Sequence, residues 1–297
     1  MNFSEYTLVS FGDSFTFGQD TVPMYKHQPH GSPKQWKKDC NLNSYTQVIA
    51  DRMGFKDCLN FGLLGCSTER SFTLLESFLR TNPDKKVFVL FNFTSASRFM
   101  NIFKVDNKRE YDIVDLTPTT FEKELVKEGR YSGITKRGLH NQYTYWRNSV
   151  QDVYSHIKDR RNLYYLLSSY NTPHVTFDVL NDIDYRILRD NPLKYILSND
   201  GFGVDFMYKD DADYVLKEMD FFNSYYQELV NNSPLLCHMG IDELGGLLNL
   251  ARYINNKAKL EYGNENYYQT NDGHWNIEGH HEVAKLIEDF IKKKYKN

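Results

Sequence analysis

The strongest constraint on the fold is the run VFVLFNF at residues 87–93, which is apolar on both faces. A strand with one face in water alternates apolar and polar side chains, whereas a strand covered on both faces is apolar throughout. The run therefore predicts the central strand of a sheet that is covered on both sides. Shorter apolar runs at residues 8–11, 58–61 and 174–180 predict three further strands.

Helical patterns alternate with these strands. Ser44 can cap a helix that ends at Gly54, and another helix is expected to begin after Ser67 or Thr68. A longer helical pattern covers residues 141–168. The last helix is marked by apolar residues at helical spacing, namely Val283, Leu286, Ile287, Phe290 and Ile291. Alternating strands and helices predict an α/β fold with a parallel sheet between helical layers.

The length of 297 residues favours one large domain spanning residues 1–297. Two stretches do not fit a further strand–helix unit. Residues 101–140 begin polar and irregular, and residues 182–262 are rich in Tyr, Asp and Asn with helical pieces. Both are interpreted as parts of the one domain, the first as an insertion and the second as an insertion or lid packed on the sheet.

Charge and hydropathy exclude several classes of partner. The net charge is −3, from 36 Lys+Arg and 39 Asp+Glu, so no strong field would attract nucleic acid or anionic lipid. No run of about 18 apolar residues predicts a membrane span. The N-terminal segment lacks the features of a cleaved signal peptide, which predicts a protein that is cytoplasmic as synthesised.

A serine stands at the predicted carboxyl end of the first strand, in the sequence Phe11-Gly12-Asp13-Ser14. Open α/β sheets bind ligands at that edge, and Gly12 permits a tight turn. Ser14 would then begin the next segment, where free backbone N–H groups can hold an oxyanion. A serine nucleophile needs a base within hydrogen-bonding reach. The alternative is a serine that only caps a turn, with Asp13 as a turn-stabilising acceptor.

The segment NDGHWN at residues 271–276 supplies a candidate base. Asp272 and His274 are two positions apart in a loop, so their side chains can point the same way. The carboxylate can then fix the imidazole tautomer and stabilise the imidazolium formed during attack. Trp275 is expected to anchor this loop and to contribute to substrate binding.

A metal site is not expected. His280 and His281 lie in the first turn of the last helix and are interpreted as structural or solvated. A zinc site that combined them with His274 would lack a fourth ligand at a plausible spacing. The four cysteines show no short paired spacing, which argues against a metal knuckle and a disulfide framework; they are Cys40, Cys58, Cys66 and Cys237.

Three blocks resemble the SGNH (GDSL-like) hydrolase superfamily in the order in which that family has them. They are Gly12-Asp13-Ser14, NFGLLG at residues 60–65, and DGHWN at residues 272–276 followed by Gly279-His280. The Asp-x-His-Trp form is similar to the alginate-acetyltransferase-like branch. The likeness covers roughly residues 5–100, 165–180 and 265–292 and leaves the two insertions unmatched.

The resemblance implies a flavodoxin-like three-layer α/β/α sandwich and acyl-ester chemistry without a cofactor. In it Ser14 is the nucleophile, His274 the base and then the acid, and Asp272 the residue that orients His274. The oxyanion is held by the backbone N–H groups of Ser14 and Gly65 and by a side chain of the third block.

The third block departs from the family. The family pattern Gly-x-Asn-Asp is replaced by Asn92-Phe93-Thr94-Ser95, so Thr94 falls where the oxyanion-binding Asn would be. Thr94 is the predicted donor, and Asn92 is the alternative. Arg98, just beyond this block, is a candidate clamp for an anionic substrate group, with a salt bridge to the insertion as the alternative.

The predicted function is a serine esterase that removes a short acyl group, such as O-acetyl, from a carbohydrate or similar polar substrate. The aromatic richness, with 22 Tyr and 20 Phe, agrees with a sugar substrate. An O-acyltransferase with the same triad is one alternative. The other is a binding or structural module with weak catalysis, which Thr94 and the large insertions favour. The Asn-, Lys- and Tyr-rich composition is typical of AT-rich genomes such as those of bacteriophages, where such a module could belong to a virion or a homo-oligomeric assembly.

Overall fold

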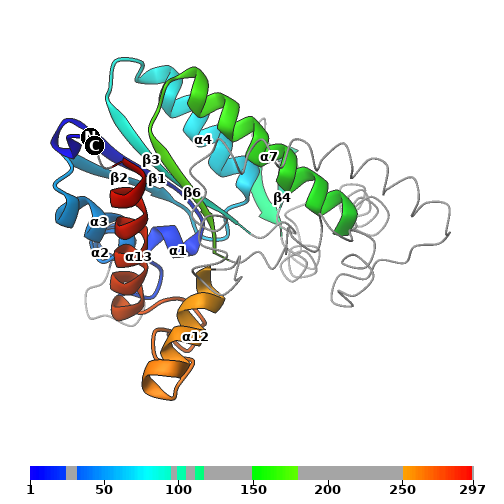
Figure 1. Cartoon of the computed structure of the whole chain (residues 1–297). Coiled ribbons are helices and arrows are strands. Elements are labelled where there is room, and N and C mark those ends of the chain that lie inside the picture. The colour runs from blue at the N-terminus through cyan, green and yellow to red at the C-terminus, as the bar shows by residue number, and fades with distance from the viewer. Residues whose placement is uncertain (25–31, 95–98, 105–110, 117–148, 180–249, 296–297) are drawn as a thin grey trace, which may run out of the picture.

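The structure is a computed structural model that describes residues 1–24, 32–94, 99–104, 111–116, 149–179 and 250–295 (Figure 1). The four predicted strands are present and form one parallel sheet in the order β2-β1-β3-β6. Their bounds are Thr7–Gly12 for β1, Asp57–Gly62 for β2, Val87–Phe93 for β3 and His174–Asp178 for β6. The chain crosses from β1 outward to β2 and then back past β1 to β3.

Helices cover both faces of the sheet, which confirms the predicted three-layer α/β/α architecture (Figure 1). α3 and α13 pack together on one face, and α4 and α7 contact each other on the other. Their bounds are Tyr45–Met53 for α3, Thr68–Thr81 for α4, Ser149–Ser169 for α7 and Ile277–Tyr295 for α13. Ser44 caps α3, Gly54 ends it in the left-handed region (φ 69°), and Ser67 caps α4.

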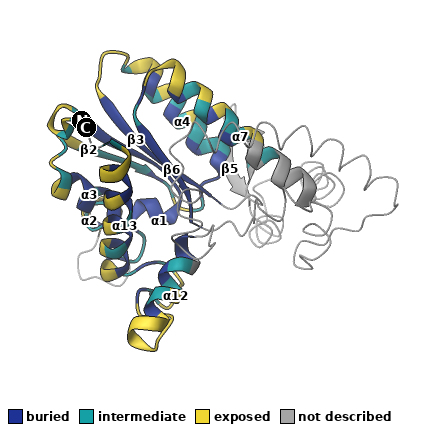
Figure 2. Ribbon diagram, viewed as in Figure 1, coloured by how far each residue is buried: buried dark blue, intermediate teal, exposed yellow. Residues whose placement is uncertain are grey.

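The sequence of β3 explains how one strand supports two cores. Phe88 and Leu90 pack in the core beneath α3 and α13, whereas Val89 and Phe91 pack beneath α4 and α7. All four side chains are fully buried (Figure 2). Burial of one such side chain contributes about 1.5–3 kcal/mol relative to exposure. The sheet is therefore held from both sides, and its carboxyl edge is a stable platform for the loops that follow the strands.

Part of the first predicted insertion is regular. β4 (Phe99–Lys104) and β5 (Tyr111–Leu116) form an antiparallel pair where an irregular chain was expected. α2 (Pro33–Leu42) lies outside the predicted helices. α12 (Leu250–Tyr262) forms the end of the second predicted insertion. The remaining residues of the two predicted insertions, 105–110, 117–140 and 182–249, lie outside the described residues. Within the described chain, no helix is long and apolar enough to cross a membrane.

Candidate active site

Ser14 is the first residue of the short helix α1 (Ser14–Phe17), directly after β1. Asp13 caps this helix, and its carboxylate accepts the backbone N–H of Phe15 at 3.1 Å. A Cβ on Gly12 would lie 2.3 Å from Thr16 Oγ1 and 2.8 Å from Asn92 Cβ, so the turn has no room for a side chain. This local geometry places the Ser14 side chain at the carboxyl edge of the sheet, where the sequence predicts it.

His274 reaches Ser14 from the loop between α12 and α13. Its Nε2 lies 3.0 Å from Ser14 Oγ. The next residue, Trp275, is fully buried and packs edge-to-face on Phe15, with ring centroids 4.7 Å apart. Because Phe15 follows the serine directly, the tryptophan fixes the histidine loop against the helix that carries Ser14. The structure thus brings together two residues that are 260 positions apart.

The carboxylate on the other side of His274 belongs to Asp20. Its Oδ2 lies 2.9 Å from His274 Nδ1, and the two side chains are only 17% and 18% exposed. Asp272, the predicted partner, is instead exposed in the loop. A turn explains the difference: Gly273 adopts φ 81°, and the N–H of Thr270 donates to the carbonyl of His274 at 2.8 Å.

The hydrogen-bonding roles at His274 follow from its partners. An ionised carboxylate only accepts, so the Nδ1 that faces Asp20 carries the proton. In the neutral ring, Nε2 then has a free lone pair, and it faces the hydroxyl of Ser14. That is the arrangement in which an imidazole can remove a serine proton.

The candidate oxyanion donors have different surroundings. Gly65 has φ 68°, and a Cβ there would have open space around it, so its backbone borders free volume. Thr94 is fully buried, and its hydroxyl and N–H lie 3.3 and 3.2 Å from the hydroxyl oxygen of Thr68. The Asn92 amide donates to Asp13 at 3.0 Å and to Thr16 at 3.3 Å, which occupies both of its hydrogens.

Two predicted substrate-binding residues have different outcomes. Trp275 is wholly buried between Phe15, Tyr45 and His280, so it forms part of the core and cannot contact a substrate. The structure therefore places the residue that was predicted to bind substrate in an anchoring position, with its whole ring inside. Arg98 lies outside the described residues.

The three C-terminal histidines contact three different partners. His280 is fully buried and accepts the backbone N–H of Tyr45 at Nδ1, and burial lowers its pKa to about 3. His281 lies beside Arg52 on the surface, while His274 faces Ser14. Among the described residues, no group of three or more His, Cys, Asp or Glu side chains is arranged to hold a metal ion.

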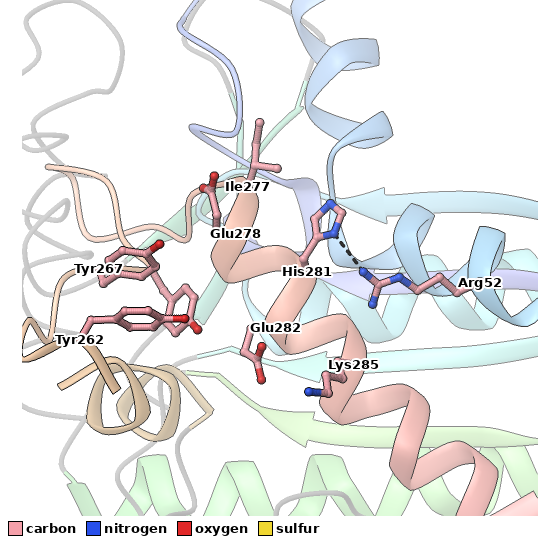
Figure 3. A pocket seen from close by; sticks show the side chains of 9 residues that line it. Arg52, Tyr262, Tyr267, Ile277, Glu278, His281, Glu282 and Lys285 are labelled. Carbon is pink, nitrogen blue, oxygen red and sulfur yellow. Dashed lines mark hydrogen bonds between the residues drawn. The ribbon is translucent and has the colours of Figure 1, made fainter. Parts of the chain in front are cut away.

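A hollow of about 420 Å³ opens between the loop after α12 and the first turns of α13 (Figure 3). Tyr262 and Tyr267 form one wall; their rings are stacked 4.0 Å apart and are 52% and 43% exposed. Arg52 and His281 lie across from them, 3.0 Å apart. Because a guanidinium only donates, His281 Nδ1 accepts, which leaves Nε2–H of the neutral ring as a donor.

Comparisons with known proteins give structural likenesses only. No family model and no curated protein matches the sequence. A psychrotrophic esterase from Pseudoalteromonas matches at 12% identity over 98% of this chain and 99% of its own, with a TM-score of 0.43. A member of the lipolytic protein G-D-S-L family from Veillonella parvula matches at 12% identity over 98% of each chain, with a TM-score of 0.38. An acetyl xylan esterase matches at 11% identity over 95% of this chain and 98% of its own, with a TM-score of 0.41.

Proposed function

We propose that the protein is a serine ester hydrolase in which Ser14 is the nucleophile and His274 the general base. The observation that carries this proposal is the 3.0 Å contact between Ser14 Oγ and His274 Nε2. The second ring nitrogen of the histidine faces a carboxylate, so the basic nitrogen points at the serine. A serine that only capped a turn would need neither contact.

The reaction follows from these positions. Ser14 Oγ attacks the acyl carbonyl while its proton moves to His274 Nε2, and the tetrahedral intermediate collapses when that proton passes to the leaving alkoxide. The acyl–serine ester is then hydrolysed by water, with His274 again as base. We assign the developing oxyanion to the backbone N–H groups of Ser14 and Gly65. The Thr94 hydroxyl at the end of β3 is the third candidate donor.

We propose a short acyl group on a neutral carbohydrate as the substrate. The hollow beside the histidine loop supports this class, because stacked tyrosine rings offer apolar faces and His281 offers a donor. Its lining carries two basic side chains, Arg52 and Lys285, against two acidic ones, Glu278 and Glu282. This balance favours a neutral polyhydroxylated ligand over an anion.

Tyr267, which lines the hollow, and His274, the proposed base, lie in the same loop between α12 and α13. The chain passes from Tyr267 and Tyr268 through a turn to His274, and Gln269 pairs with Trp275 across that turn. The backbone N–H of Asn276 also donates to the carbonyl of Tyr268 at 3.0 Å. A sugar bound against the tyrosines would therefore lie beside the loop that carries the histidine.

Covalent labelling tests the nucleophile. The wild-type protein, incubated with a fluorophosphonate, should gain the mass of one phosphonyl group, and peptide mapping should place it on Ser14. Ser14→Ala should remain unlabelled, while Ser10→Ala, a change at a buried serine four residues earlier, should still be labelled. An unlabelled wild-type protein would favour the binding or structural module instead.

An acyltransferase with the same residues differs only in the group that accepts the acyl chain, and the Asp-x-His-Trp segment is the observation that favours it. Acetate release from an acetylated glycan, measured with and without a second unmodified glycan, distinguishes the two. A hydrolase releases the same amount of free acetate in both cases. A transferase releases less when the acceptor is present, and the acceptor gains the missing acetyl groups.

A further inference from the structure

Two aspartates are candidate partners of His274, one close to it in the sequence and one distant. The close one, Asp272, belongs to the same DGHWN segment, whereas Asp20 belongs to the turn after α1. We propose that Asp20, and not Asp272, is the residue that positions His274 for base catalysis. This inference rests on the serine hydrolase proposed above.

The turn after α1 fixes Asp20 relative to the nucleophile. The backbone N–H groups of Gly18 and Gln19 both donate to the carbonyl of Ser14, at 3.1 and 3.0 Å. Thr21 closes the turn, because its hydroxyl donates to the carbonyl of Gly18 at 2.8 Å. Asp20 itself has φ 65°, a left-handed conformation that Asp and Asn tolerate better than most residues. Ser14 and Asp20 therefore belong to one hydrogen-bonded unit.

The contact between Asp20 and His274 is largely shielded from water. The two side chains are 17% and 18% exposed. The nearby thiol of Cys40 remains neutral, since burial raises its pKa to about 11 and the charge of Asp20 acts in the same direction. A charge-assisted hydrogen bond in such surroundings is stronger than one in water.

Asp272 has the opposite surroundings. It lies exposed at the tip of the turn in which Gly273 N–H donates to the Thr270 carbonyl at 3.0 Å. The two ring nitrogens of His274 are already engaged by Ser14 and Asp20. An exposed carboxylate interacts with a nearby charge by only about 0–1 kcal/mol.

Asp20 would act through His274 and would not touch the substrate. Its carboxylate keeps the proton of the neutral ring on Nδ1, so that the lone pair of Nε2 faces Ser14. It also stabilises the imidazolium that forms when the serine proton moves to the ring. No proton passes to Asp20.

The test compares Asp20→Asn with Asp272→Asn. Asparagine accepts the same left-handed backbone and has the same shape, so Asp20→Asn should fold, which far-UV circular dichroism verifies. Its amide donates to Nδ1 and so favours the wrong tautomer. We expect kcat on a short-chain aryl ester to fall about 10³–10⁴-fold with little change in KM. Asp272→Asn should stay within about fivefold of wild type.

A second readout does not depend on activity. The ¹⁵N chemical shifts of the His274 ring, recorded where the ring is neutral, should report Nδ1–H in wild type and Asp272→Asn and Nε2–H in Asp20→Asn. The inference is overturned if Asp20→Asn leaves kcat and the tautomer unchanged, or if Asp272→Asn is the variant that changes the tautomer. If the wild-type protein hydrolyses no ester, the proposed function fails, and the ring shifts still decide the role of Asp20.

Discussion

Asn92 Nδ2 lies 3.0 Å from a carboxylate oxygen of Asp13, the residue that caps the helix carrying Ser14. The second hydrogen of the same amide points to Thr16 at 3.3 Å. Both donors of Asn92 therefore stabilise the cap of α1, and neither faces the side chain of Ser14. Asn92 supports the position of Ser14, and its amide is engaged by Asp13 and Thr16.

This geometry separates the roles of Asn92 and Thr94 in a first prediction. Thr94→Val keeps the size of the side chain but removes its hydroxyl, so we expect kcat to fall with little change in KM. A lost oxyanion donor costs about 10²–10³ in kcat, and a weaker donor costs less. Asn92→Ala should instead lower thermal stability, because the buried carboxylate of Asp13 loses a partner. A Thr94→Val enzyme with wild-type kcat would leave the two backbone N–H groups as the oxyanion site.

The second prediction concerns the serine and histidine as one unit. Ser14→Ala and His274→Ala should each lower kcat on an aryl ester by 10³-fold or more, as is typical when such a unit is broken. Because the two residues act together, the double variant should be about as inactive as either single variant. Losses that multiply in the double variant, or a Ser14→Ala protein that keeps about a tenth of the rate, contradict the assignment.

The third prediction concerns pH and His280. Burial lowers the pKa of His280 to about 3, whereas an unfolded histidine has a pKa of about 6.5. Between these values the unfolded chain binds one more proton, so the free energy of unfolding falls as the pH is lowered from about 6.5, by about 1.4 kcal/mol per pH unit from this group. Above that window the contribution no longer depends on pH.

Urea unfolding of the wild-type protein and His280→Gln at pH 7, 6 and 5 measures this contribution. Glutamine can still accept the Tyr45 N–H, but it does not titrate. The variant should therefore lose less stability than wild type as the pH falls. A slope remains, because burial also lowers the pKa of His174. Parallel losses in the two proteins would show that His280 does not carry the effect.

The fourth prediction tests the substrate class. Tyr267→Ala removes one of the two rings of the tyrosine wall, and the loss of an aromatic contact of about 0.5–1.5 kcal/mol should raise KM for acetylated xylan about 2- to 12-fold. Hydrolysis of 4-nitrophenyl acetate, which carries no sugar, should not change. Tyr165→Ala is the matched control, because Tyr165 is 44% exposed on α7. Equal KM values for the two variants, or no acetate release from acetylated xylan and glucomannan, would argue against a sugar substrate.

The sequence predicted the parts of the fold that depend on local pattern. The apolar run of β3, the Ser44 and Gly54 signals around α3 and the spacing in α13 each depend on near neighbours, and all three elements are present. The pairing of β4 with β5 was missed, because their sequences FMNIFK and YDIVDL carry only a short alternation between polar stretches.

The contact between Asp20 and His274 could not be predicted either, and the reason is a different one. Sequence proximity favoured Asp272, since two positions separate it from His274. The spatial neighbour is Asp20, and the two are 254 positions apart. Only the docking of the C-terminal loop on α1 decides between them. The one local signal was Gly18, which can end α1 and turn the following residues back toward the serine.

The pairing of a local unit with a distant histidine also has a consequence for biosynthesis. Ser14 and Asp20 emerge from the ribosome almost together, whereas His274 follows 260 residues after the serine. Before α13 and its preceding loop dock, Ser14 has no base beside it, and the proposed mechanism then predicts an unreactive hydroxyl. In the mechanism proposed above, a chain whose C-terminal loop has not docked would not react, so fluorophosphonate labelling would count the molecules in which His274 has reached Ser14.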